Sequence, residues 1–345
     1  MLDPTLLHLD FGDPQGEART CRSACALFDF SFVGRAVITG SSALSLIAKL
    51  TPRSLDHLQP GGIAYCLHEN AAGHLVSDLT VWNHGGGRFE VMSGRIEDLA
   101  KLYTLASSDA VVEDLTDQTA IFALQGPKSL MALSGLADIE RISRLQYFHH
   151  LTTSVAGVDC VVGRLGYTGE AGFELILPVM ARDHIWSNLS KRARPAGFLA
   201  IDILRLEAGF VLFANEFKCP VTAREAGLGH FSQSISCQER DAIDLICFTC
   251  ETQPPEMPFR PKPPFLLPKH QNDVVVTSAC ESPAAGRTLG LGYVLDVSAR
   301  PSDQPLVDTS GVFKSIRIAP RPFVDPGKRR PRLDWDTQAI PNTES

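Results

Sequence analysis

The chain has 345 residues, of which 44% are hydrophobic and 21% are charged, and its formal net charge is −7. A chain of this length exceeds what one hydrophobic core usually supports, so two or three domains are expected. The composition is that of a soluble globular protein and excludes a disordered or fibrous one. The acidic balance also argues against nucleic acid as a partner, because phosphate binding requires a basic face.

Neither a membrane span nor an export signal is expected. No run reaches the ~20 apolar residues of a transmembrane helix, and the first residues carry acids where a signal peptide carries Lys or Arg. The nine cysteines are an odd number and widely scattered, which predicts reduced, mostly buried thiols in a cytoplasmic protein. Cys247 and Cys250 form one CxxC pair without a second, so zinc or redox chemistry there is the less favoured alternative and no metal site is expected.

Residues 20–125 alternate short β-type runs with stretches of helical periodicity. Asn- and Gly-rich turns separate several of the runs, as in a meander. The pattern predicts a first α+β unit with strands at 36–39, 65–67, 75–82 and 88–92 and helices at 42–50 and 95–106.

A second α+β unit is expected to follow. It begins with a buried strand at 120–124, after which Gln125-Gly126-Pro127 opens a helix, since proline suits the first turn. The remaining expected elements are a strand-like run at 153–162, a Gly-rich turn at 166–172, a strand at 173–177, and helices near 181–192 and 201–210.

Seven prolines lie between residues 251 and 270, so we expect a linker or an irregular edge there. Residues 273–318 return to short strands separated by Gly and Pro, which predicts a small β-rich domain. The last residues are rich in Pro, Arg and Asp and are predicted to be disordered. The expected organisation is therefore a region of two α+β subdomains at 1–240, a β-rich domain at 241–318 and a tail at 319–345.

The segment 164–174, RLGYTGEAGFE, combines three glycines, two carboxylates and a tyrosine. Glycines let a backbone approach a ligand closely, and a carboxylate at a strand edge can accept two parallel N–H bonds from a planar heterocycle such as a pterin or guanine. A tight turn with solvated acids explains the same residues equally well. The residues alone leave both interpretations open.

The segment also resembles the signature of the glycine-cleavage T-protein (aminomethyltransferase) family. Further matches follow in that family's order at 26–31, 73–81, 124–127, 204–209, 225–229, 277–278, 282–283 and 290–294. The resemblance implies an α+β fold of three domains in a ring-like arrangement, with a small C-terminal β-barrel-like domain. It also implies that tetrahydrofolate, or its 5-methyl or 5,10-methylene derivative, binds in a central channel.

The resemblance also implies roles for individual residues. The pterin is held by Glu174, Tyr167 lines the same site, and Tyr65 matches a tyrosine of the folate channel. Arg205 anchors either a folate carboxylate or an inter-domain salt bridge, and Ser93 stands at a channel position where the family commonly has asparagine. Glu170 is expected to be a structural or solvated acid.

The chain departs from the family where two successive aspartates are usual, because it reads Ser77-Asp78. Asp78 is therefore the candidate catalytic acid or base, although neighbouring residues on a strand face opposite sides. Ile201 replaces an arginine of the family. The opening segment lacks a Gly-Ala-x-Met-Val-x-Phe stretch, so a lipoyl carrier protein is not expected as partner.

The resemblance predicts a tetrahydrofolate-dependent one-carbon transferase acting on a small methylated or aminomethylated donor. Such an enzyme mainly positions its reactants and excludes water. Two alternatives stay open: a non-catalytic folate-binding accessory protein, and the folate-domain partner of a separate oxidase or dehydrogenase. No GxGxxG loop is present, so no flavin or nicotinamide site of that kind is expected.

Overall fold

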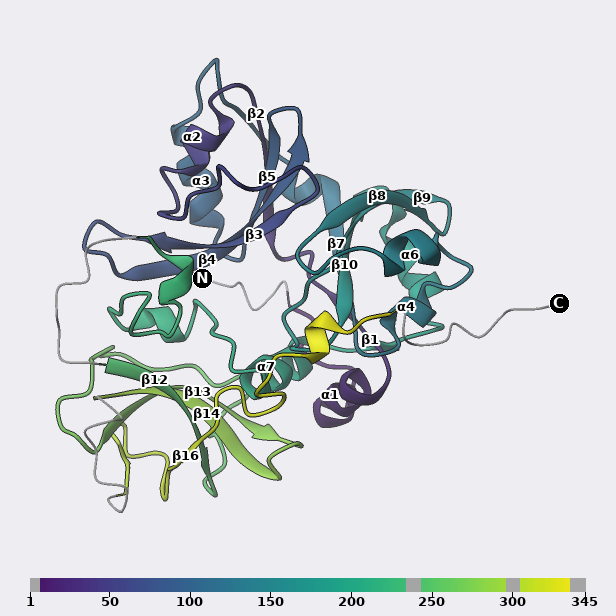
Figure 1. The fold of residues 1–345 in the computed structure, drawn as a ribbon. Coiled ribbons are helices and arrows are strands. Elements are labelled where there is room, and N and C mark those ends of the chain that lie inside the picture. Colours follow the sequence, from purple (N-terminus) through teal and green to yellow (C-terminus); the bar gives the residue numbers. More distant parts are fainter. Residues whose placement is uncertain (1–6, 234–242, 296–304, 336–345) are drawn as a thin grey trace.

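The computed structural model describes residues 7–233, 243–295 and 305–335, which form three β-sheets with short helices packed on them (Figure 1). The expected α+β fold is confirmed. No helix in these ranges is long and apolar enough to cross a membrane. The expected boundary at 240/241, Cys237 and the last ten residues lie outside the described residues.

The first sheet has the order β3-β4-β5-β2-β6 and is antiparallel. Along β4, Leu75, Ser77 and Leu79 are buried, whereas Asp78 and Thr80 on the other face are partly exposed. This period of two sends neighbouring side chains to opposite faces. The elements are β2 (Gly34–Thr39), α2 (Ala43–Ile47), β3 (Ile63–Glu69), β4 (Leu75–Gly85), β5 (Arg88–Ser93), α3 (Ile96–Thr104) and β6 (Val111–Asp114).

The second sheet has the order β11-β1-β7-β10-β9-β8. The single strand-like run expected at 153–162 is wrong: it is a hairpin, because Ala156 and Gly157 adopt φ values of 49° and 82° and turn the chain. The elements are β1 (Ala26–Asp29), η2 (Thr116–Gln118), β7 (Thr119–Gln125), α4 (Ser129–Ala132), α5 (Ile139–Ser143), β8 (His150–Val155), β9 (Val158–Gly163), β10 (Gly172–Pro178), η3 (Val179–Ala181), α6 (Arg182–Leu189) and β11 (Arg194–Pro195).

Helices α1 (Pro14–Ser23) and α7 (Phe198–Glu207) pack against each other. The Asp13 side chain caps α1 by accepting a hydrogen bond from the Gly16 backbone N–H, and Pro14 occupies the first turn. All but one of the residues of α7 are buried, including Asp202, Arg205 and Glu207. Such a helix must lie inside the molecule, and Figure 1 shows it between the second and third sheets.

The third sheet has the order β15-β13-β14-β12-β16 and is visibly curled (Figure 1). Its strands are β12 (Ile243–Cys250), β13 (Asp273–Ser282), β14 (Arg287–Leu295), β15 (Val307–Asp308) and β16 (Arg317–Ala319). Residues 251–270 form neither helix nor strand. Cys247 and Cys250 are buried free thiols on β12, and burial raises the pKa of Cys247 to about 12, so the thiol form persists.

Residues 320–335 follow β16 and are named here the C-terminal strap. The expectation of disorder is wrong for this part of the tail, which runs from the third sheet past α7 to the second (yellow in Figure 1). Trp335 is buried and stacks on Phe173 with ring centroids 5.8 Å apart, and Arg321 donates to the carbonyls of Gly209 and Ala226. These contacts offset the entropy cost of ordering a proline-rich, charged segment. The strap also contains η7 (Arg330–Arg332).

Candidate functional site

A cavity of about 670 Å³ is lined by residues of the first and second sheets, and its walls are mostly apolar and aromatic. The lining residues belong to β3–β5, the segment 165–174, the first half of α7, residues 208–213 after that helix, residues 227–231 and the C-terminal strap. A concave apolar cavity with a few convergent polar groups is typical of a ligand site. Four of the six predicted site residues line it, namely Tyr65, Asp78, Tyr167 and Glu174.

Glu174 is held on β10 between Ala123 of β7 and Gly163 of β9. Its carboxylate has no hydrogen-bond or ion-pair partner among the described residues, and burial raises its pKa to about 7. An unpaired carboxylate in an apolar wall costs stability. The arrangement suits a ligand that brings two N–H donors to this carboxylate.

The loop before β10 is fixed by Gln125. The Gln125 Nε2 donates to the Leu165 carbonyl at 3.1 Å, and its Oε1 accepts from the Thr168 hydroxyl at 2.9 Å. A Cβ atom on Gly166 would lie 1.9 Å from the Gln125 Oε1, so a larger residue there would displace this amide from its hydrogen bonds. The Tyr167 hydroxyl donates to the Val211 carbonyl, and its ring stacks on Phe210 at 6.0 Å, which fixes one wall of the cavity.

Asp78 faces the cavity from β4 opposite this loop. The Tyr65 hydroxyl donates to the Asp78 Oδ2 at 2.9 Å. Burial raises the pKa of Asp78 to about 6, although the Tyr65 hydrogen bond opposes the rise. A carboxyl group with a pKa in this range can both accept and return a proton near neutral pH. The Phe231 ring packs edge-on against Tyr65 at 4.9 Å and shields the pair.

Ser77 and Ser93 lie on the opposite side of the first sheet, where α3 covers it. Both hydroxyls donate to the Oδ2 of Asp98, and the other Asp98 oxygen contacts the His68 Nδ1 at 2.8 Å and Arg95 Nη1 at 2.8 Å. Ser93 therefore does not line the cavity, in contrast to its predicted role. The strand alternation noted in the sequence explains why Asp78 and Ser77 serve different places.

Arg205 also lies outside the cavity lining, buried at 0% exposure. Its guanidinium donates to Asp202 at 2.9 Å, to Glu216 at 3.1 Å and to the Ser278 hydroxyl of β13 at 2.7 Å. These two carboxylates raise its pKa above the usual range, against the effect of burial. Arg205 therefore belongs to an ion-pair network that reaches the third sheet through the Ser278 hydroxyl, and not to the cavity wall.

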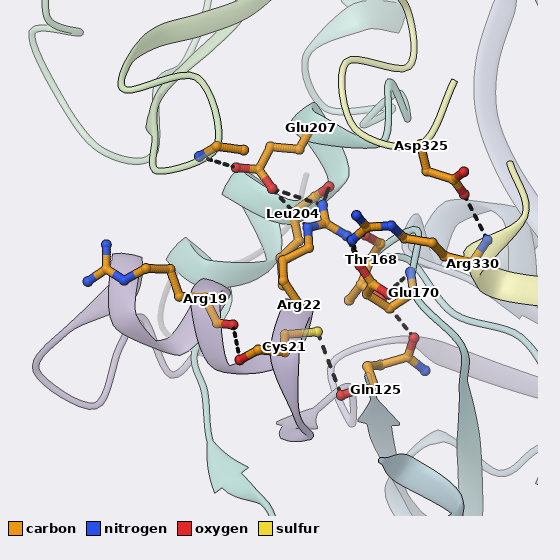
Figure 2. A network of polar contacts seen from close by, with 12 residues as sticks. Arg19, Cys21, Arg22, Gln125, Thr168, Glu170, Leu204, Glu207, Asp325 and Arg330 are labelled. Carbon is orange, nitrogen blue, oxygen red and sulfur yellow. Dashed lines mark hydrogen bonds and ion pairs between the residues drawn. The ribbon is translucent and has the colours of Figure 1, made fainter. Parts of the chain in front are cut away.

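A second polar network joins the glycine-rich loop to the rest of the molecule (Figure 2). Arg22 of α1 pairs with Glu170 at 2.9 Å and with Glu207 at 2.9 Å, and Arg330 of the strap reaches the same Glu170 oxygen at 2.7 Å. Glu207 also accepts from the Ser282 hydroxyl at 2.7 Å. The prediction of a structural Glu170 is thus confirmed.

Several cavity residues were missed in the sequence. Tyr147 and Phe148 line the cavity before β8, and Phe148 adopts a φ of 62°, which is unfavourable for a bulky side chain and is typical of functional sites. The adjacent aromatic residues were the one available signal. Lys328 and Arg332 were missed because they were assigned to a disordered tail.

Among residues 7–233, 243–295 and 305–335, no group of His, Cys, Asp or Glu is arranged to hold a metal ion.

Comparisons with known proteins agree with this architecture. Residues 11–234 match the family model described as the GCVT N-terminal domain. The chain is similar to a probable aminomethyltransferase of Natronomonas pharaonis, with 33% identity over 341 residues covering 92% of each chain. It is also similar to an aminomethyltransferase of Streptomyces avermitilis, with 30% identity over 336 residues covering 91% of this chain and 88% of the relative.

A solved structure shows the same fold. The glycine cleavage system aminomethyltransferase T from Bartonella henselae superposes with a TM-score of 0.73, covering 92% of this chain and 91% of that chain. The sequence identity is 22%, so this likeness concerns the fold.

Proposed function

The chain belongs to the aminomethyltransferase (glycine cleavage T-protein) family, and we propose that this folate-dependent one-carbon transferase moves a methyl or aminomethyl group from a small donor to N5 of tetrahydrofolate. When bound, tetrahydrofolate supplies the nitrogen that receives the one-carbon unit. The observation that carries the proposal is the unpaired Glu174 carboxylate in the wall of the central cavity.

In this proposal, Glu174 holds the pterin ring of the folate. Pairing with two N–H donors favours the ionised carboxylate, so ligand binding lowers the pKa of Glu174 from about 7. The bound form is thereby stabilised by charge-assisted hydrogen bonds that the free protein lacks. Tyr167 and Phe148 line the same cavity with flat aromatic surface, which suits an aromatic or partly reduced heterocycle.

Asp78 is the proposed catalytic group. Its Oδ2 is engaged by the Tyr65 hydroxyl, and its Oδ1 can accept the proton released during transfer. The Tyr65 hydrogen bond fixes the orientation of the carboxylate, while the aromatic walls exclude water. The presence of this hydrogen-bonded pair in the cavity wall, together with relatives named as transferases, favours an enzyme over a binding-only protein.

The proposal extends to the donor, the partner and the cellular compartment. In this proposal, a small methylated or aminomethylated donor occupies the cavity together with the pterin. Ile201 is a cavity residue where the family has arginine, so this wall offers a donor no charge. A carrier protein or an oxidase that delivers the one-carbon unit is compatible with the same site, and we place the reaction in the cytoplasm.

Isothermal titration under anaerobic conditions tests the proposal. Tetrahydrofolate and 5-methyltetrahydrofolate are titrated into the wild type, into Glu174→Ala and into Glu113→Ala, which changes an exposed glutamate of β6. We expect saturable binding in the wild type and in the Glu113 variant, with at least about a hundredfold loss in Glu174→Ala, as for a doubly hydrogen-bonded charge. Unchanged affinity in Glu174→Ala would refute the site, and no binding by the wild type would refute the function.

A further inference from the structure

Arg321 is a cation in the cavity wall that has no acidic partner. It lies at the start of the C-terminal strap, between the end of α7 and β12, and lines the cavity. Within the described part of the chain it forms no ion pair, and burial lowers its pKa. A cation that is removed from water without a counter-ion costs stability, so the arrangement suits an anionic ligand.

The guanidinium of Arg321 is fixed by three backbone carbonyls. Its Nε donates to Gly209 at 3.1 Å, and its Nη1 donates to Ala226 at 3.2 Å and to Leu245 at 3.3 Å. Its Nη2 makes no hydrogen bond to a described residue and is not sealed inside the protein. The two N–H donors of this nitrogen therefore remain for a ligand.

Two glycines make room for this arginine. Gly209 and Gly227 both line the cavity, and their φ values are positive, at 70° and 71°. A Cβ atom on Gly209 would lie 2.8 Å from the Arg321 Cγ, and one on Gly227 would lie 2.8 Å from its Nη1. A larger residue at either position would displace the arginine, so the backbone forms a cradle for it. A ligand therefore meets a cation that is already held in place, which lowers the entropy cost of binding.

Tyr65 connects Arg321 to the proposed catalytic carboxylate. The Tyr65 hydroxyl donates to Asp78 at 2.9 Å, and Tyr65 lies near enough to Arg321 to affect the pKa of the arginine. Glu216 also acts on Arg321 from a distance, but both of its carboxylate oxygens already accept hydrogen bonds from other groups. The cation thus lies near the place where the proposed function transfers the one-carbon unit.

The charge at this place favours a small monoanion. One guanidinium balances one negative charge, whereas a phosphate dianion would bring an unbalanced charge into a mostly apolar wall. The carboxylates of folate are separated from N5 by the aminobenzoyl group. A cation near the Asp78–Tyr65 pair therefore suits the other reactant, which is the donor.

Resting on the proposed function, we propose that Arg321 binds the carboxylate of the one-carbon donor, and that this donor is a small methylated or aminomethylated carboxylic acid. The Nη2 donors hold the carboxylate through charge-assisted hydrogen bonds. The end of the donor that carries the one-carbon unit then extends towards Asp78. Arg321 is thus a specificity-determining residue that distinguishes acids from uncharged or purely cationic amines.

Titration calorimetry of the protein saturated with tetrahydrofolate tests this proposal. The probes are N-methylglycine, N,N-dimethylglycine and glycine betaine, each paired with the amino alcohol that has a hydroxymethyl group in place of the carboxylate. We expect at least one acid to bind at least about tenfold more tightly than its alcohol, because a charge-assisted bond replaces a neutral one.

Variants assign this preference to one side chain. Arg321→Gln should bind acid and alcohol alike and keep its affinity for tetrahydrofolate within about threefold. Arg317→Gln, which changes an exposed arginine of β16 outside the cavity lining, should keep the full preference. Arg321→Lys keeps the charge without the planar guanidinium and should lose at least about threefold in acid affinity.

The outcomes separate this donor site from the proposed function. A wild type that shows no acid preference, or an Arg321→Gln protein that retains it, overturns the donor site while the folate site stands. A loss of more than about tenfold in tetrahydrofolate affinity in Arg321→Gln also overturns it, because the arginine then serves the folate. A wild type that binds no tetrahydrofolate refutes the proposed function and the donor assignment together. If Arg321→Gln does not fold, the wild-type comparison and Arg321→Lys decide between these outcomes.

Discussion

Replacing Glu174 with glutamine is expected to stabilise the ligand-free protein while weakening folate binding. Burial raises the pKa of Glu174 to about 7 from an ordinary 4.5, and no partner among the described residues offsets it. The native state therefore binds the proton more tightly than the unfolded state, so this residue contributes most to stability at low pH. That contribution is lost as pH rises towards 7.

The magnitude follows from the size of the pKa shift. About 2.5 pKa units at ~1.4 kcal/mol each give an upper limit of about 3 kcal/mol at pH 8, falling to about 1 kcal/mol at pH 5. Glutamine keeps the shape without the charge and removes this penalty. The Glu174→Gln protein should thus be more stable than the wild type by up to about 3 kcal/mol at pH 8 and by up to about 1 kcal/mol at pH 5.

Urea unfolding of the ligand-free proteins at both pH values measures this difference. Glu113→Gln serves as the matched control, because the same substitution at an exposed position of β6 should change stability by less than about 0.5 kcal/mol. A Glu174→Gln protein that is no more stable at pH 8, or whose advantage does not depend on pH, would show that the carboxylate is not held unpaired at a cost.

Three further outcomes are expected. The Asp78→Asn protein should bind folate within about threefold of the wild-type affinity but lose at least about a hundredfold in turnover. The wild-type rate should rise with pH through about 6 as Asp78 ionises. Equal turnover in the variant would remove Asp78 from the mechanism. Ser77→Asp places a second carboxylate beside buried Asp98 and should lower the free energy of unfolding in urea by about 3 kcal/mol. The Ser77→Asp/Asp98→Ser double variant should recover this stability. A double variant without recovery would contradict the contact between positions 77 and 98. Trp335→Ala should cost about 3 kcal/mol because it empties a buried stack on Phe173, and an unchanged urea midpoint would show that the strap end does not pack.

Local patterns in the sequence were enough to predict most of the fold. The alternation along β4 and the glycine-rich turn before β10 depend on neighbours in sequence, and both elements form where they were expected. The hairpin at 150–163 was missed because a non-glycine residue, Ala156, takes a positive φ in its turn. Sequence patterns do not reveal such a conformation when the tertiary structure imposes it.

Some cavity residues could be identified from the sequence and others could not. Glu174, Tyr167, Tyr65 and Asp78 were identified through the family resemblance, and all four line the cavity. The C-terminal strap was misjudged because its composition is that of a disordered segment. Its order depends on partners that are distant in sequence, including Phe173 for Trp335 and Glu170 for Arg330. Composition reports the entropy cost of ordering a segment but not the contacts that offset it.

The structure gives one explanation for two departures from the family pattern, Ser77 and Ser93. Both positions face α3 rather than the cavity, and both serines donate to the one carboxylate of Asp98. A carboxylate at position 77 would be repelled by the buried carboxylate of Asp98, whereas a serine hydroxyl donates a hydrogen bond to it. The loss of the first aspartate is therefore a repacking behind the sheet, and the cavity retains its own acid, Asp78, in hydrogen-bond contact with Tyr65.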